Sequence, residues 1–166
     1  EKVAASDWEL SWTRRRHYGL IRVVEGRAFF DAAAWQHEAI PGDILYVERE
    51  DTYRVTAGPD GCRMIVANFF VADGRSQTPF PFPRSFRTAR VSLYEALFHE
   101  LLTAWTGKGV AHRVQSRSIL ESILYNLVYD ALQERLHASG IGKIQPALAH
   151  IERNYNRDVR VDELAA

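Results

Sequence analysis

Apolar and polar side chains alternate along the first half of the chain, at the two-residue period of a β-strand. Four segments rich in β-branched and aromatic residues predict strands, namely 17–30, 44–47, 53–56 and 64–71. Gly26 marks a turn or bulge inside the first of them, and the sequence GPDG at 58–61 predicts a tight turn between the last two. Short strands at this spacing are typical of a β-sandwich or β-barrel.

The second half of the chain changes to the 3.6-residue period of an α-helix. Ser92 and Glu95 have the spacing of a capping box, which predicts a helix that begins there and ends near Gly107. A second, longer helix is predicted over 112–137, with apolar side chains on more than one face. Before these helices, residues 73–90 contain three prolines and predict an irregular connector.

The end of the chain, 144–166, predicts one helix and the start of another. Pro146 suits the first turn of a helix, where a missing N–H costs little. Three apolar residues then share one face of that helix: Leu148, Ile151 and Tyr155. The glycine-containing segment 139–143 predicts a short flexible joint in front of it.

This order of elements resembles that of the AraC (AraC/XylS) family of bacterial transcription regulators. The sequence IPGDIL at 40–45 is similar to the family's turn into a core strand. The sequence VEGR at 24–27 stands where the family has a strand closing on two glycines, with Ala28 in place of the second. The tail at 144–166 resembles the start of the family's C-terminal helix-turn-helix domain.

The resemblance implies a mainly β fold with α: a cupin-like β-barrel of the jelly-roll type, then an antiparallel helix pair, then a truncated helical segment. It implies an effector-binding barrel with its connector over 1–90 and dimerisation helices over 91–138. A joint over 139–143 and the truncated start of the DNA-binding domain over 144–166 would follow.

One segment departs from the family pattern. Members carry a proline and a histidine just after the strand that follows the PGD turn, whereas this chain has EREDTY at 48–53. Thr52 or Tyr53 occupies the approximate place of the histidine. The family's histidine contact is therefore not carried over to this chain.

Charge and cysteine content narrow the classes of function. The 166-residue chain has 21 basic and 21 acidic residues, and this balance argues against nucleic-acid binding by the bulk of the chain. The single cysteine, Cys62, excludes an intrachain disulfide and favours a reducing compartment. The sequence has no apolar run of about 18 residues and opens with no signal-peptide pattern, so we expect a cytoplasmic protein.

The histidines and the cysteine do not form patterns typical of metal binding or catalysis. The strand half has only His17 and His37, far apart in sequence, without the His-x-His pair that metal-binding cupins use. Cys62 has no histidine near it in sequence, and the acidic run at 48–51 is typical of a solvated loop. The G-x-S-x-G and P-loop motifs are absent from the sequence. We therefore expect no metal, no cofactor and no enzymatic activity.

Strand alternation predicts a ligand site inside the barrel. Ile21, Val23 and Glu25 fall on one strand face, and a carboxylate that faces the interior needs an arginine, water or a ligand. The arginines at 14–16 precede this strand, and one of them can pair with Glu25 or hold an anionic ligand. Because family members that respond to sugars bind them in this barrel, the resemblance implies a small, sugar-like effector. The predicted ligand-binding residues, whose aromatic members also suit ordinary barrel packing, are Arg16, Glu25, Trp35, Tyr46, Tyr53, Ile65 and Ala67.

The second predicted helix has an additional side that suits a homodimer interface. The predicted interface residues are Ile119, Ile123, Asn126 and Asp130. A polar residue in a helix–helix seam can fix the register of the two helices, and Asn126 either does this or faces solvent.

Together these patterns predict the sensing and dimerisation region of an AraC-type regulator. Such a region binds a small effector, forms a homodimer, has no membrane partner and contacts DNA only through the C-terminal domain that this chain lacks. Two alternatives remain open. One is a stand-alone cupin enzyme such as a sugar isomerase or dioxygenase, against which the missing histidine cluster argues. The other is a dimerisation module without a ligand.

Overall fold

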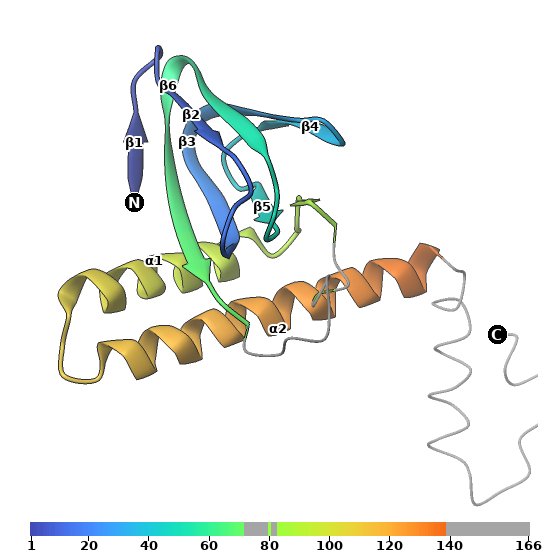
Figure 1. Cartoon of the computed structure of the whole chain (residues 1–166). Coiled ribbons are helices and arrows are strands. Elements are labelled where there is room, and N and C mark those ends of the chain that lie inside the picture. The colour runs from blue at the N-terminus through green and yellow to red at the C-terminus, as the bar shows by residue number, and fades with distance from the viewer. Residues whose placement is uncertain (72–79, 81–82, 139–166) are drawn as a thin grey trace, which may run out of the picture. The chain divides into compact units, whose positions relative to one another are not determined.

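The computed structural model describes residues 1–71, 80 and 83–138 (Figure 1). Its strands are β1 (Lys2–Ala4), β2 (Glu9–Trp12), β3 (Tyr18–Ala32), β4 (Trp35–Ala39), β5 (Ile44–Val47), β6 (Tyr53–Phe69) and β7 (Ser85–Phe86). Its helices are α1 (Val91–Gly107) and α2 (His112–Ala138). The chain divides into two compact units, of which the first, Glu1–Leu127, contains the strands, α1 and the beginning of α2. The second unit begins at Val128.

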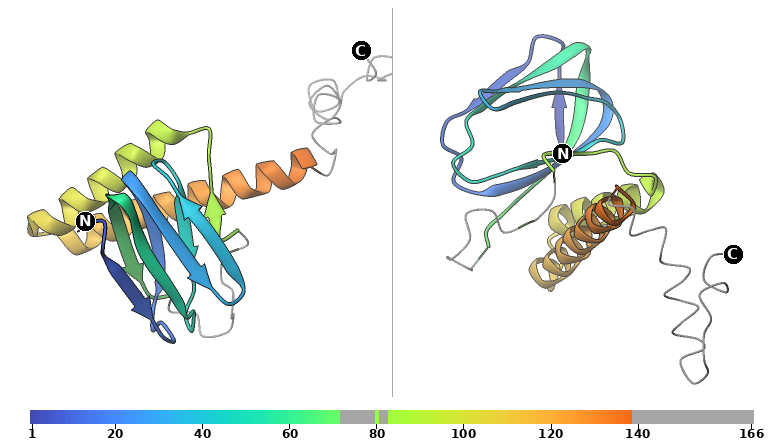
Figure 2. Two further views of the ribbon diagram at one scale, coloured as in Figure 1. Left: turned by 90° about the horizontal axis from the view of Figure 1, so that it is seen from above. Right: turned by 90° about the vertical axis from the view of Figure 1, so that its right-hand side faces the viewer.

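The strands form one seven-stranded antiparallel sheet in the order β1-β6-β3-β5-β7, with β2 also paired to β6 and β4 to β3. The long strands β3 and β6 pair with each other over nearly their whole length. β3 also pairs with one short strand near each of its ends, β5 and β4, whereas β6 pairs with β2 at its beginning and with β1 near its middle. The sheet curves around a common interior (Figure 2). The pairings among the described residues leave this sheet open. The fold is therefore mainly β with two helices, as predicted.

The sequence predicts β5 correctly and β3 nearly so, but the predicted turn at 58–61 does not separate two strands. β6 runs without interruption from Tyr53 to Phe69. Cys62 pairs with Gly26 and Ala57 pairs with Ala28, so residues 58–61 bulge out opposite a single residue of β3. The turn-forming residues create this bulge without ending the strand, because the pairing with β3 resumes on both sides.

Two glycines make the bulge possible. Gly26 has φ +68° and Gly61 has φ +76°, a left-handed conformation that side chains disfavour. A Cβ on Gly26 would lie 2.1 Å from the carbonyl oxygen of Gly61, and a Cβ on Gly61 would lie 2.4 Å from the carbonyl oxygen of Ala4. The backbone of β6 therefore approaches those of β3 and β1 more closely here than a residue with a side chain would allow.

One face of the sheet, which we call the inner face, carries the main apolar core. Its buried members are Ala4, Ile21, Val23, Ala28, Phe30, Ala39, Leu45, Val47, Tyr53, Val55, Ala57, Cys62 and Met64. Five partly buried apolar residues pack against them: Trp8, Trp12, Ala32, Trp35 and Val66. Burial of this much aliphatic and aromatic surface is the main stabilising contribution to a sheet of this size.

The opposite face of the sheet is also buried near the helices. Strand register places Leu20 and Tyr46 next to each other on this face, with Arg22 one step further along β3. The Arg22 guanidinium, whose side chain is 7% exposed, lies 3.9 Å from the Glu95 carboxylate of α1. An arginine this deeply buried keeps an acidic partner, and this pair connects α1 to the sheet.

The helices lie close to their predicted positions, with one local difference. α2 begins at His112 as predicted, but α1 begins one residue before Ser92, with Arg90 as its N-cap and no side-chain hydrogen bond to the cap. The predicted capping box at Ser92 is therefore wrong. α1 and the beginning of α2 run antiparallel and side by side (Figures 1 and 2). Lys108, with φ 48°, ends α1 in the left-handed conformation.

The predicted joint at 139–143 and the predicted DNA-binding segment at 144–166 lie outside the described residues. Neither described helix is apolar enough along its length to cross a membrane.

Candidate functional site

Arg15 and Asp43 are the most deeply buried charged residues of the described chain, each with 1% of its surface exposed, and of the two only Arg15 carries a positive charge. Its Nε donates to the carbonyl oxygen of His17 at 3.0 Å, Nη1 donates to the Tyr53 hydroxyl, and Nη2 donates to Oδ1 of Asn68. All three acceptors are neutral. No ion pair joins Arg15 to a carboxylate among the residues that the structure describes.

The backbone around Arg15 explains why this arginine, and not its neighbours, points inward. Arg14 adopts a left-handed φ of 47°, which bends the chain just before Arg15. The Arg15 N–H donates to Asp51 O at 3.0 Å, and Glu50 N donates to Arg15 O at 2.8 Å. Arg14 pairs instead with Glu50 at 2.9 Å on the surface, and Arg16 is exposed.

Gly19 provides the space that the Arg15 side chain occupies. A Cβ at position 19 would lie 2.6 Å from Nη2 of Arg15 and 2.9 Å from Cγ2 of Val47. The absence of a side chain at this point of β3 lets the guanidinium lie against the sheet.

Aromatic rings surround the Arg15 guanidinium. Its Cζ lies 5.2 Å from the centroid of the Trp12 ring and 5.9 Å from that of Tyr53, within the range of cation–π attraction. The Tyr53 ring in turn lies 6.2 Å from the rings of Phe30 and Trp35. We call Arg15, Trp12, Trp35, Tyr53 and Asn68 the Arg15 cluster.

The buried charge affects its titratable neighbours. Burial lowers the pKa of His17, and the charge of Arg15 lowers it further, whereas a hydrogen bond with Asn68 acts in the opposite direction. Burial raises the pKa of Tyr53, although Arg15 offsets part of this effect. At neutral pH the Arg15 cluster therefore combines a neutral phenol with one fixed positive charge, and the protonated form of the neighbouring His17 is disfavoured.

The predicted ligand-binding residues do not converge on one site. Trp35 and Tyr53 lie together on the inner face, in contact with each other. Glu25 and Arg16 are exposed. The other three, Tyr46, Ile65 and Ala67, belong to the opposite face. Ligand contacts by these residues stay predictions.

Strand irregularity explains why alternation misplaced Glu25. A register shift between Val23 and Glu25 breaks the two-residue period, so the side chain after Val23 on the inner face is not Glu25. Glu25 instead pairs with Arg63 on the surface, where its side chain is 67% exposed. In β6 the inner face carries Met64 and Val66, whereas the sequence predicted Ile65 and Ala67 there.

Sequence reasoning missed two members of the cluster, Trp12 and Asn68, and it selected Arg16 where Arg15 is the buried arginine. Asn68 has the same strand parity as Met64 and Val66, so a correct assignment of the inner face would have found it. Three consecutive arginines carry no local signal that selects Arg15. Its selection depends on the left-handed conformation of Arg14 and on contacts with residues far along the chain.

Three further arginines, spaced three residues apart, attach the segment before α1 to the rest of the first unit. Arg84 donates to Asp51 at 2.6 Å and to Glu48 at 3.0 Å. Arg87 donates to both carboxylate oxygens of Asp43, at 2.9 and 3.0 Å. We call Arg84, Arg87 and Arg90 the connector arginines.

Arg90 extends this attachment to α2. Its Nη1 donates to Oδ1 of Asn126 at 2.9 Å, and its Nη2 donates to the backbone carbonyl oxygen of Asn126 at 3.3 Å. The Nδ2 of Asn126 donates to Ser122 O at 2.8 Å. Asn126 therefore makes contacts inside its own chain.

The predicted dimer residues in the first unit lie on the covered side of α2. Ile119 is 7% exposed and Ile123 is 0% exposed, so other side chains of this chain already cover both. Asp130 belongs to the second unit. A dimer role for these residues stays a prediction, and the structure offers a more accessible surface on the same helix.

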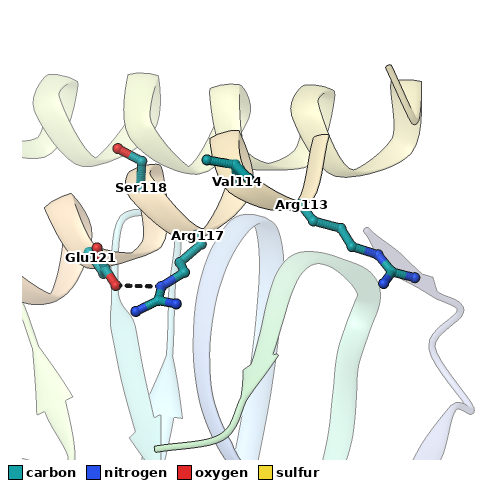
Figure 3. A pocket seen from close by; sticks show the side chains of 5 residues that line it. All are labelled: Arg113, Val114, Arg117, Ser118 and Glu121. Atoms are coloured by element: carbon teal, nitrogen blue, oxygen red, sulfur yellow. Dashed lines mark hydrogen bonds and ion pairs between the residues drawn. The ribbon is translucent and has the colours of Figure 1, made fainter. Parts of the chain in front are cut away.

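That accessible surface lies on the other side of the first part of α2. Val114 is 73% exposed and Tyr125 is 69% exposed, and their separation of 11 residues returns to nearly the same helix direction. A surface pocket adjoins them, lined by Arg113, Val114, Arg117, Ser118 and Glu121 (Figure 3). Arg117 pairs with Glu121 across this pocket at 2.8 Å. We call Val114 and Tyr125 the exposed α2 pair.

Among the described residues, no group of three or more histidine, cysteine, aspartate or glutamate side chains is arranged to hold a metal ion. Cys62 is buried, and burial raises the pKa of its thiol, which makes it a poor nucleophile at neutral pH.

No protein-family model matches the sequence, and no curated protein matches it. Among solved structures, the chain is similar to the AraC-like transcriptional activator CuxR, with a TM-score of 0.52 and 12% sequence identity. That similarity covers 73% of this chain and 48% of the activator, so this chain spans about half of the activator's length. A structural-genomics protein of unknown function from Rhizobium leguminosarum bv. viciae 3841 is similar over 39% of this chain and 61% of its own, with a TM-score of 0.37 and 19% identity.

Proposed function

We propose that this chain is the effector-sensing and dimerisation region of a transcription regulator of the AraC type. The observation that carries the proposal is the fold shared with an AraC-like activator over 73% of the chain. The curved sheet, the attached antiparallel helices and the order in which they occur also agree with the resemblance of the sequence to that family. In this proposal the sheet is a cupin-like barrel, and DNA is contacted by a separate C-terminal domain.

The Arg15 cluster is the proposed sensing site. It combines one charged donor, a hydroxyl, an amide and several flat aromatic surfaces on the inner face. Small-molecule sites usually have this composition, with a few polar groups set in an apolar lining. A role in sensing, rather than in catalysis, suits a cluster whose only charged group is an arginine, because arginine does not exchange protons near neutral pH.

The connector arginines give the proposed sensor a physical link to its helices. The loop at 48–52 holds the backbone of Arg15 on one side and accepts Arg84 on the other. Arg87 and Arg90 continue from there to Asp43 and to Asn126 of α2. An effector that moved the Arg15 cluster would therefore act on the helices through a few charged hydrogen bonds, provided that it binds the two arrangements unequally.

The exposed α2 pair is the proposed centre of the homodimer. Large apolar side chains with more than two thirds of their surface exposed are candidates for burial by a partner, and the charged residues around the neighbouring pocket would form a polar rim.

A reporter assay tests the proposal with the whole chain. The chain is fused in front of a DNA-binding domain that occupies its operator only as a dimer, in cells that carry a gene under that operator. We expect the fusion to regulate the reporter, and Tyr125→Asp to abolish regulation at unchanged protein level. A well-expressed fusion that leaves the reporter unregulated would refute the proposal.

A second candidate function, dimerisation without a ligand, is favoured by the dense packing of the inner face. Thirteen buried residues fill this face, and the polar atoms of the Arg15 cluster already bind one another. A ligand that raises the melting temperature of the chain progressively as its concentration increases above its Kd would exclude this candidate.

A further inference from the structure

The charge balance at Arg15 is incomplete. Arginine stays protonated in proteins, and a charge removed from water normally requires an opposite charge close by. Two other arginines with little exposure have carboxylate partners, Arg22 with Glu95 and Arg84 with Asp51. Arg15 is 1% exposed and has only neutral acceptors among the described residues.

The hydrogen-bond balance at Arg15 is incomplete as well. A guanidinium has five N–H groups. Nε uses its single N–H on His17 O, and each terminal nitrogen uses one N–H, on Tyr53 or on Asn68. One N–H therefore remains on each of the two terminal nitrogens. Two N–H groups on neighbouring nitrogens suit the two oxygens of a carboxylate.

We propose that Arg15 binds the carboxylate of a small organic acid whose apolar body packs against the aromatic side chains of the cluster. This proposal rests on the proposed sensing function, and it defines the chemical class of the effector as a monocarboxylic acid rather than a neutral sugar. A sugar would supply more neutral hydrogen bonds and would leave the buried charge without a partner.

The surroundings favour one carboxylate over a phosphate. A phosphate group carries close to two negative charges at neutral pH and usually binds to several cations. The cluster offers one cation, because Arg14 is paired with Glu50 at the surface and Arg16 is exposed. The apolar part of the acid would lie against Trp12 and Trp35, which are only partly buried.

Access to Arg15 is easiest beside Asn68. Asn68 is exposed although its Oδ1 accepts from Arg15, whereas Tyr53, the other side-chain acceptor, is 4% exposed. A carboxylate that enters beside Asn68 and accepts the two remaining N–H groups adds charge-assisted hydrogen bonds to the neutral one that Asn68 already makes. The acid would also place a negative charge near His17, whose pKa Arg15 now lowers.

The test compares acids with their neutral amides on the whole chain at constant ionic strength. The probes are butyrate, benzoate, phenylacetate and indole-3-acetate, each paired with the corresponding amide and accompanied by glucose and arabinose. We expect at least one acid to raise the melting temperature by roughly 3–6 °C at about ten times its Kd, and its amide to have no such effect. Arg15→Gln should weaken binding of that acid about tenfold or more, whereas the surface control Arg16→Gln should leave it unchanged.

A second measurement uses only the wild-type chain and therefore needs no folded variant. The pKa of His17, followed by NMR in the wild-type chain, should rise when the acid binds, because the carboxylate neutralises Arg15. Equal binding of acids and amides, or no binding of any acid, overturns the proposal. A sugar that binds in place of the acids also overturns it but leaves the sensing function intact. If the chain binds an acid but its reporter fusion is inactive, the proposed acid site at Arg15 stands and the proposed function as a transcription regulator is refuted.

Discussion

Arg87 holds Asp43 through two parallel hydrogen bonds, from Nε to Oδ1 at 2.9 Å and from Nη2 to Oδ2 at 3.0 Å. The Asp43 side chain is 2% exposed, and its Oδ2 also accepts the backbone N–H of Ile40 at 3.1 Å. One carboxylate therefore closes the turn before β5 and fastens the segment that leads into α1. The PGD sequence at 41–43, noted first as a turn signal, thus also anchors the helices.

Asp43→Ala should destabilise the chain by about 2 kcal/mol, because it leaves the partly buried N–H of Ile40 without its acceptor and releases Arg87. Asp43→Asn is the matched control, since its amide oxygen can still accept from Ile40 but cannot pair with Arg87 as a charge. Urea unfolding measures the free energy of unfolding of both variants. We expect Asp43→Asn to lower it less than Asp43→Ala does. Equal stability of Asp43→Ala and wild type would show that Asp43 does not anchor this segment.

Stability should depend on pH through Asp43. Burial by itself raises the pKa of Asp43, but hydrogen bonds from Arg87 and Ile40, together with the charge of Arg87, outweigh burial and lower it overall. A carboxyl whose pKa is lowered by folding contributes stability above its unfolded pKa of about 3.9 and loses it as pH falls through the folded pKa. The difference in unfolding free energy between wild type and Asp43→Asn should therefore shrink as the pH falls below about 4. A difference that grows on acidification would contradict this assignment.

Gly26→Ala should cost about 2 kcal/mol or more, because residue 26 has a positive φ and its new Cβ would collide with the Gly61 carbonyl. The matched control is Gly107→Ala at the end of α1, where a new Cβ meets nothing within 4 Å. We expect the control to be neutral or slightly stabilising in thermal unfolding. Similar melting temperatures for the two variants would show that the bulge tolerates a side chain.

Tyr125→Asp should weaken the homodimer about tenfold or more without unfolding the chain, because it places a charge on a surface that the partner would bury. His99→Glu, which adds a charge on the exposed side of α1, is the control. Sedimentation equilibrium measures the dissociation constants, and circular dichroism checks the fold. If both variants associate as the wild type does, the dimer uses another surface.

The parts of the fold that sequence predicts well are those where periodicity is regular over many residues. α2 and β5 begin where their patterns begin, because neither contains an irregular residue. Alternation fails in β3 and β6, because each register shift moves the following side chains to the other face. For this reason the sequence prediction placed Glu25 on the wrong face. Gly26 lies between the two register shifts of β3.

The candidate site was predictable only in part. Trp35 and Tyr53 were selected as aromatic surfaces and do lie together on the inner face. The position of Arg15 depends on a backbone bend at Arg14 and on the missing side chain of Gly19. Both are tertiary relationships, and the local sequence of three arginines contains neither of them.

The connector arginines also decide where this chain can be recombined with another. Arg84, Arg87 and Arg90 lie on one short segment, but the groups that accept them lie in a loop, in a turn and on α2. A chimera that exchanged only the helices would leave Arg90 without Asn126, and one that exchanged only the sheet would leave Arg84 and Arg87 without their carboxylates. The smallest exchangeable module therefore includes both the sheet and the helices, and evolution by domain shuffling would have to move them together.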